Sequence, residues 1–203
     1  MTFILDMGSG NTCQNDKRII ERMIREIGDI DQGVNKVILK WQLFNSAPPN
    51  IPLTHESFKF AYDLAERLCF ETTSSVFDLD SMRYLMQFNV PFVKIANRPD
   101  LYELEKYSTV PVYISTSQSG LHIDNAVMMA CVSKYPAEIE DYESAFNYKD
   151  MEVVSDHTVG WGLYNKYFPR ILEKHYVHER LPNNPDAGLF AVTQIELDEV
   201  INA

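Results

Sequence analysis

The segment EVVSDHTVGWGLYNKYFPRILEKHYV, residues 152–177, contains two β-rich runs and the connection between them. The runs EVVSDHT (152–158) and RILEKHYV (170–177) are largely apolar, and the intervening GWGLYNKYF has room for one or two helical turns. Apolar runs of this kind are typical of parallel strands that helices cover on the outside. The segment therefore predicts two parallel neighbouring strands joined by a short helix.

Six further β-rich runs precede this pair, namely FILDMG (3–8), KVILKWQ (36–42), LCFETTSSV (68–76), FVKIA (92–96), VPVYIST (110–116) and AVMMACVS (126–133). Eight such runs with helical or turn-rich connections predict an α/β fold, a (β/α)8 TIM barrel that fills residues 1–203 as a single domain. A typical barrel takes about 250 residues, so we expect a compact barrel with shortened or missing helices. A doubly wound open sheet is the alternative fold.

Helical patterns lie between the runs. In residues 16–28 apolar side chains recur on one face, and Gly28 is expected to end the helix. An aspartate is expected to cap the third helix, and Thr193 the last one. Residues 117–125 leave little room for any helix. The predicted helices are 16–28, 55–68, 78–88, 138–146 and 193–201.

The composition is that of an ordinary globular protein, with 45% hydrophobic and 23% charged residues. A formal net charge of −11 argues against nucleic-acid binding, because no basic stripe is available to displace counterions. No run is long and apolar enough for a membrane span, and the N-terminus has no basic region typical of a signal peptide. Cys13, Cys69 and Cys131 are widely spaced, which predicts free thiols and a cytoplasmic location.

Polar residues gather where the predicted strands end. In barrels of this type the chemistry lies at the C-terminal ends of the strands, so these side chains predict a pocket mouth. The residues concerned are Asp6, Lys40, Gln42, Thr73, Ser74, Ser75, Lys94, Asn97, Ser115, Thr116, Ser133, Tyr135, Ser155, Asp156, His157 and His175.

Two lysines among them, Lys40 and Lys94, follow apolar residues within strands. Burying an ammonium group is costly unless an anion meets it. With the serine hydroxyls at neighbouring strand ends, these lysines predict a cradle for a phosphate or carboxylate. The alternative is that they pair with Asp6 or Asp156.

Two histidines, His157 and His175, end the last two strands. Adjacent strands lie about 4.8 Å apart, so both imidazoles can reach one metal ion. Manganese, iron, cobalt and zinc all suit two histidines with a substrate oxygen completing the shell. A pair of core histidines held by carboxylates is the alternative. His178 lies at an odd offset from His175, on the other face of a strand, and is not expected to be a ligand.

Several short motifs, in this order along the chain, resemble the barrel domain of N-acetylneuraminate (sialic acid) synthases, which condense phosphoenolpyruvate with an N-acyl sugar. The motifs are FDLDS (77–81), KIA (94–96), ISTS (114–117), KYPA (134–137), VSDHTVG (154–160), and EKH followed ten residues later by PD (173–186). PD closes a PNNPD turn at 182–186.

The resemblance implies roles for individual residues. His157 and His175 match metal-binding histidines, which usually hold manganese, and Asp6 takes the place of a glutamate at the end of the first strand. The metal polarises the sugar aldehyde, C3 of phosphoenolpyruvate attacks it, and water adds at C2 before phosphate leaves. Positions that hold phosphoenolpyruvate are matched by Lys40, Ser75, Lys94, Ser115 and Ser155, and positions that contact the amino-sugar acceptor by Gln42, Tyr135 and Asp186.

The loop NRPD (97–100) departs from the family pattern of serine, glycine and an acid. Asn97 replaces the serine, and Asp100 supplies a catalytic acid only if one residue is inserted. Ser133 stands where an asparagine often contacts the sugar.

The family's C-terminal antifreeze-like domain, which reaches a partner's active site in the dimer, has no counterpart in the 203 residues. We therefore expect a more open site. For the oligomeric state, a monomer and a homodimer are the two alternatives. The main hypothesis is a phosphoenolpyruvate-condensing enzyme. A binding or structural module on an altered barrel is the alternative, and a different metal-assisted lyase or isomerase is a third.

Overall fold

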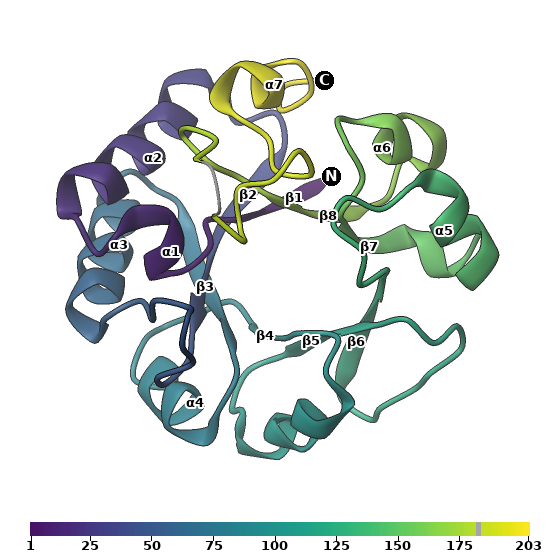
Figure 1. The fold of residues 1–203 in the computed structure, drawn as a ribbon, viewed down its shortest axis with the longest axis horizontal. Coiled ribbons are helices and arrows are strands. Elements are labelled where there is room, and N and C mark those ends of the chain that lie inside the picture. The colour runs from purple at the N-terminus through teal and green to yellow at the C-terminus, as the bar shows by residue number, and fades with distance from the viewer. Residues whose placement is uncertain (182–183) are drawn as a thin grey trace.

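Eight parallel strands close into a barrel in the computed structural model, which describes residues 1–181 and 184–203 (Figure 1). Each strand pairs in parallel with the next, and the last pairs with the first, which confirms the predicted barrel and rules out the open sheet. The strands are β1 (Thr2–Asp6), β2 (Lys36–Leu43), β3 (Glu71–Val76), β4 (Val93–Ile95), β5 (Val112–Thr116), β6 (Ala126–Cys131), β7 (Val153–Asp156) and β8 (Ile171–His175).

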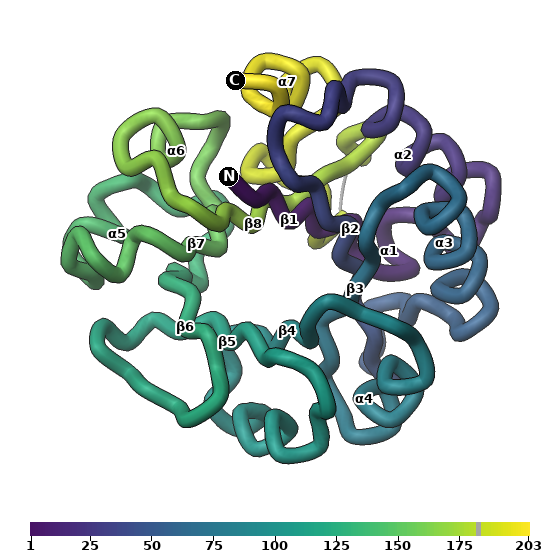
Figure 2. Tube along the Cα trace, turned by 180° about the vertical axis from the view of Figure 1, so that it is seen from behind, coloured from purple at the N-terminus to yellow at the C-terminus, as the bar shows by residue number. Residues whose placement is uncertain are grey.

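The helices are long on one side of the barrel and short on the other. In Figure 1, α2 and α3 flank the first three strands, whereas Figure 2 shows β5 and β6 joined by a loop without a helix, as predicted. Among the described residues, no helix has the length and apolar character needed to cross a membrane. The helices are α1 (Gly10–Cys13), α2 (Lys17–Ile30), α3 (His55–Arg67), α4 (Leu79–Leu85), α5 (Ile139–Ala145), α6 (Gly162–Tyr167) and α7 (Gln194–Asp198), with 3-10 helices η1 (Pro99–Tyr107) and η2 (Asp150–Glu152).

Helix α2 corrects the prediction that Gly28 ends it. The helix continues to Ile30, and the backbone N–H of Asp31 closes the last turn on the carbonyl of Ile27. Gly28 is helical here, and a Cβ added to it would only make an ordinary contact with Phe70 at 3.6 Å. Glycine therefore does not act as a C-terminal stop at this position.

The predicted strands run past the observed ones at several ends. The third predicted strand starts at residue 68, but Cys69 has a φ of 65°, a left-handed turn that separates α3 from β3. At the other end, β6 stops at Cys131 and β7 at Asp156. Ser133 and His157 therefore lie in the first residues of the loops, where their side chains face the barrel mouth.

The barrel interior is built in two layers. Alternate residues along a strand point inward, so Ile4 and Asp6 of β1 both face the axis, as do Ile171 and Glu173 of β8. The lower layer is apolar, and the layer above it is polar, so the apolar layer forms a closed floor beneath the polar one. The floor consists of Ile4, Ile38, Phe92, Met129, Val153 and Ile171, with Tyr113 and Val127 packed against it.

Candidate active site

A cavity of about 490 Å³ lies above this floor, at the C-terminal ends of the strands. This position agrees with the rule for barrels of this type. Among the residues given a catalytic or binding role, all but Asp100 line it: Asp6, Lys40, Gln42, Ser75, Lys94, Asn97, Ser115, Ser133, Tyr135, Ser155, His157, His175 and Asp186. Residues not predicted for the site also line it: Phe77, Ala96, Arg98, Cys131, Glu173 and Pro185. The wider prediction of a polar pocket mouth is wrong for four residues that do not line the cavity: Thr73, Ser74, Thr116 and Asp156. The hydroxyls of Thr73 and Ser74 donate instead to the backbone carbonyls of Phe92 and Trp41.

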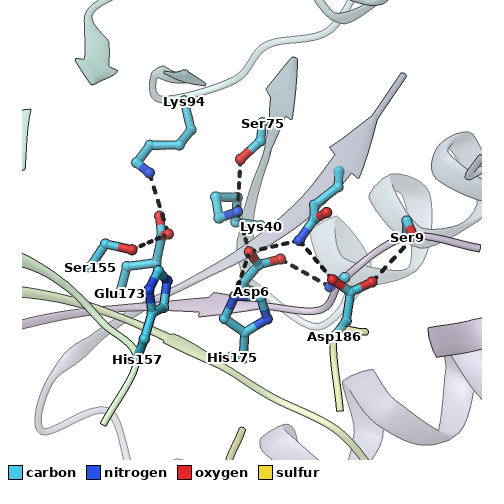
Figure 3. Close-up of polar contacts among 12 residues, drawn as sticks. Asp6, Ser9, Lys40, Ser75, Lys94, Ser155, His157, Glu173, His175 and Asp186 are labelled. Carbon is cyan, nitrogen blue, oxygen red and sulfur yellow. Dashed lines mark hydrogen bonds and ion pairs between the residues drawn. The ribbon is translucent and has the colours of Figure 1, made fainter. Parts of the chain in front are cut away.

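Lys40 is buried at the base of the cavity and has two partners (Figure 3). Its Nζ donates to Asp6 Oδ2 at 2.6 Å and to Ser75 Oγ at 2.8 Å. Burial opposes ionisation of Asp6, but the ammonium of Lys40 outweighs it and holds the pKa of Asp6 well below its usual range. The alternative prediction, that a lysine pairs with Asp6, is therefore confirmed for Lys40.

Lys94 forms a second buried group across the barrel. Its Nζ donates to Ser115 Oγ at 2.6 Å and lies 3.3 Å from Glu173 Oε1, which also accepts from Ser155 Oγ at 2.9 Å. Burial raises the pKa of Glu173, and the charges of Lys40 and Lys94 more than reverse that effect. Glu173 Oε2 is buried without a hydrogen-bond partner among the described residues. One carboxylate oxygen therefore remains for a ligand or water.

Glu173 was missed by the sequence prediction, although the motif EKH contains it. His175 was expected to face inward, and the residue two positions before it on a strand faces the same way. Asp156, in contrast, does not pair with either cavity lysine. Its carboxylate accepts from Lys174 Nζ at 2.9 Å on the outer face of β7 and β8, where both side chains are fully buried.

His157 is oriented by bonds on two sides. Its Nδ1 donates to the carbonyl of Val132 at 2.7 Å, and its backbone N–H donates to the hydroxyl of Tyr142 at 3.0 Å. Because Nδ1 carries the proton, the lone pair lies on Nε2. Burial and the neighbouring His175 lower the pKa of His157 to about 3, so the imidazole is neutral at physiological pH.

His175 stands next to His157, with ring centroids 5.7 Å apart (Figure 3). Its Nε2 lies 3.7 Å from Asp6 Oδ2, and its Nδ1 is buried without a hydrogen-bond partner in the described part of the chain. Phe190 packs edge-on against His175 at 5.0 Å, and Tyr135 lies over His157 at 4.1 Å. The two aromatic rings restrict how the imidazoles can turn.

The two histidines suit a divalent metal ion in their chemistry. His157 carries its proton on Nδ1, which leaves Nε2 free to bind a metal, and Nδ1 of His175 is buried without a hydrogen-bond partner among the described residues. Within residues 1–181 and 184–203, no three His, Cys, Asp or Glu side chains are grouped to hold an ion. A bound ion would therefore depend on His157 and His175, with substrate and water as its other ligands.

Asp186 closes the side of the cavity near β1. Its Oδ1 accepts from Gln42 Nε2 at 3.4 Å, and its Oδ2 accepts from the hydroxyl of Ser9 at 3.3 Å. Burial raises the pKa of this carboxyl group. The first two residues of the predicted PNNPD turn lie outside the described residues. Gly8 approaches so closely that a Cβ there would lie 3.0 Å from Asp186 Oδ2, and its φ of 73° also favours glycine.

The NRPD loop divides between the cavity and the surface. Asn97 lines the cavity and donates through Nδ2 to Ser133 Oγ at 2.9 Å, so these two predicted residues meet. Asp100 lies outside the cavity, exposed at the start of η1, where its carboxylate holds the guanidinium of Arg98 at 2.6 Å. Arg98, rather than Asp100, lines the cavity.

Comparisons with known proteins identify similar folds. No protein-family model matches the sequence, and no curated protein matches it. The fold is similar to an N-acetylneuraminic acid (sialic acid) synthetase from Leptospira borgpetersenii, with a TM-score of 0.75 and 19% identity, covering 98% of this chain and 80% of that one. A spore coat polysaccharide biosynthesis protein from Bacillus subtilis gives a TM-score of 0.72 at 19% identity, covering 99% and 66% of the two chains.

A more distant similarity is to a phospho-2-dehydro-3-deoxyheptonate aldolase from Thermotoga maritima, with a TM-score of 0.66 and 9% identity, over 98% of this chain and 67% of that one. These similarities establish the barrel fold. The first of them agrees with the resemblance that the sequence motifs indicate.

Proposed function

We propose that this barrel joins phosphoenolpyruvate to the aldehyde carbon of an N-acyl amino sugar such as N-acetylmannosamine, with the help of a divalent metal ion, most simply Mn²⁺. The observation that carries the proposal is the pair of buried lysine–serine groups at the base of the cavity with two neighbouring histidines above them. The base provides for a small dianion, and the histidines for a metal near the reacting carbonyl.

Phosphoenolpyruvate is assigned to the base of the cavity. Lys40 and Lys94 present fixed ammonium groups, and Ser75, Ser115 and Ser155 present hydroxyls within hydrogen-bond distance of them or of Glu173. Pairing with Asp6 and Glu173 offsets the cost of burying the lysines. Charge-assisted bonds from such groups are the strong ones for phosphate and carboxylate.

The metal is assigned to His157 and His175. A bound divalent ion supplies a Lewis acid that polarises a carbonyl oxygen. The cavity also favours a cation, because each buried lysine already has a carboxylate partner and Asp186 adds a third carboxylate.

The amino sugar is assigned to Gln42, Tyr135 and Asp186, together with Asn97 and Ser133, all of which line the cavity. Carboxylate and amide groups bind hydroxyls, and the exposed ring of Tyr135 offers an aromatic face. The reaction forms a bond between C3 of phosphoenolpyruvate and the aldehyde carbon, whose oxygen takes up a proton. Water adds at C2 and phosphate leaves, giving a keto acid. Fixed geometry and charge are the contributions of the protein.

The experiment combines the protein with phosphoenolpyruvate, Mn²⁺ and a panel of N-acyl sugars, and measures released phosphate. We expect release with at least one sugar, and loss of release in both His157→Ala and Lys94→Met. The matched control is Lys106→Met, which removes an exposed lysine outside the cavity. Absence of release with every sugar, although the protein binds phosphoenolpyruvate, would reject the enzyme proposal.

One observation favours the alternative of a binding module that has lost turnover. The acid of the NRPD loop, Asp100, lies on the surface, so the cavity lacks an acid from this loop. Under this alternative, phosphoenolpyruvate binds through Lys40 and Lys94 but is returned unchanged when sugar and metal are added.

A further inference from the structure

A second cavity, of about 520 Å³, adjoins the first next to Gln42 and Asp186. The two share five lining residues, which places them on either side of one boundary: Gln42, Phe77, Arg98, Pro185 and Asp186. Figure 3 shows Asp186 on the far side of Asp6 from Lys94 and His157. A molecule whose reactive end lies at the histidines therefore points its other end toward the second cavity.

The second cavity differs from the first in its chemistry. Among the described residues, neither lysine nor histidine lines it, and its outer wall is the loop after β2, with Phe44, Asn45, Ser46, Ala47 and Asn50. The side chain of Asn45 is exposed on this wall. The rings of Phe44 and Phe77 meet edge-on at 6.0 Å, which gives the wall an aromatic surface.

Asp78 and Arg98, two charged residues that line the second cavity, already have bonding partners. Asp78 accepts from the backbone N–H groups of Asn45 and Ser81, both at 2.7 Å, as the cap of α4. Arg98 is held by Asp100 at 2.6 Å. An anionic ligand would therefore find no unpaired cation among the described lining residues. Amide and hydroxyl groups beside aromatic rings suit a neutral group rich in hydroxyls and C–H faces.

The wall is also preformed. The amide of Asn11 in α1 donates to Asn50 Oδ1 at 3.4 Å and accepts from the backbone N–H of Ile51 at 2.9 Å. The loop closes on itself through the backbone N–H of Asn50 and the carbonyl of Ala47, at 2.8 Å. Binding therefore does not have to order this loop.

We propose that the second cavity is a subsite for a neutral sugar unit attached to the acceptor at the end away from its aldehyde. The inference rests on the proposed function, because that function places the aldehyde at the histidines. The preferred acceptor is then a disaccharide whose distal unit packs against Phe44 and forms a hydrogen bond with Asn45. The distal unit takes no part in the reaction and adds affinity and selectivity.

The test compares N-acetylmannosamine with the same sugar carrying a β-linked N-acetylglucosamine on O4, by calorimetric titration in the presence of phosphoenolpyruvate and Mn²⁺. We expect the disaccharide to bind about tenfold more tightly, as two or so neutral contacts would give. Phe44→Ala and Asn45→Ala should each remove most of this preference. Ala47→Phe, which places a ring in the cavity, should abolish this preference while monosaccharide affinity stays unchanged.

Phe168→Ala is the matched control, because Phe168 is exposed at the C-terminal end of α6, away from both cavities. Equal affinity for the two sugars would overturn the inference, as would a disaccharide preference that survives Phe44→Ala and Ala47→Phe. Phosphate release with the monosaccharide is measured in parallel. Release without any disaccharide preference rejects only the subsite, whereas a Phe44-dependent preference without release supports the subsite and rejects the reaction.

Discussion

At the scale of single residues, the three cysteines are predicted to differ sharply in reactivity. Burial raises the pKa of both Cys13 and Cys131 to about 11, whereas Cys69 is exposed in the turn before β3. The thiolate is the reactive form, so a disulfide reagent at pH 8 should modify one thiol per chain quickly. A fast reaction that persists in Cys69→Ser would contradict this assignment.

Tyr142 is predicted to support the proposed metal site without being a metal ligand itself. Its hydroxyl accepts from the backbone N–H of His157 and donates to the carbonyl of Ser155 at 2.6 Å. Removing such a supporting contact should lower Mn²⁺ affinity by about tenfold. Electron paramagnetic resonance of free Mn²⁺ measures this in Tyr142→Phe. Tyr167→Phe, which removes a surface hydroxyl bonded to Glu143, is the control. Equal affinity in all three proteins would exclude the supporting role.

Much of the residue-scale site follows from the sequence, because polar side chains at the ends of apolar strands are costly to bury unless they meet a ligand or one another. Glu173 could have been predicted by the same reasoning, because it lies two residues before His175 on the same strand. The surface position of Asp100 could not have been predicted, because it depends on the path of the loop into η1 and on the bond to Arg98.

At the scale of elements, the pair Asp156–Lys174 joins β7 and β8 at the register that sets Ser155 beside Glu173. Removing one partner of a buried pair leaves an uncompensated charge, so Lys174→Met should cost about 3–5 kcal/mol of unfolding free energy. Urea unfolding measures it. Lys166→Met, which breaks an exposed pair with Glu143, should change stability little. If both variants unfold at the same urea concentration, the buried pair does not stabilise the barrel.

The predicted elements were right in kind and imprecise at their ends. Strand ends are poorly defined by residue type, so β7 and β8 were each predicted to end two residues beyond their observed C-terminal ends. The 3-10 helix η1 was missed because its residues are exposed or only partly buried, which leaves no apolar stripe to read.

At the scale of the whole molecule, ligand binding at the barrel mouth should stabilise the fold. A ligand at about 100 times its dissociation constant adds about 2.7 kcal/mol, which for a chain of this size raises the melting temperature by about 5–10 °C. We expect this shift for phosphoenolpyruvate with Mn²⁺ by calorimetry, and its loss in Lys94→Met. An unchanged melting temperature at saturating phosphoenolpyruvate would count against the assigned site.

The closed barrel was predictable as a whole, because eight apolar runs with helical connections leave few other arrangements. The pairing of Lys40 with Asp6 and of Lys94 with Glu173 was not decided by the sequence, because it depends on strand register and tilt. The same holds for the second cavity, whose outer wall is the loop after β2.

The most direct test of the proposed reaction follows the carbon that reacts. N-acetylmannosamine labelled with ¹³C at C1 is incubated with the protein, phosphoenolpyruvate and Mn²⁺, and its nuclear magnetic resonance signal is recorded together with released phosphate. Carbon–carbon bond formation predicts that the label becomes an alcohol carbon bonded to a CH₂ group, with one phosphate released per converted sugar. Phosphate release with the label unchanged would mean hydrolysis alone and would contradict the proposed condensation.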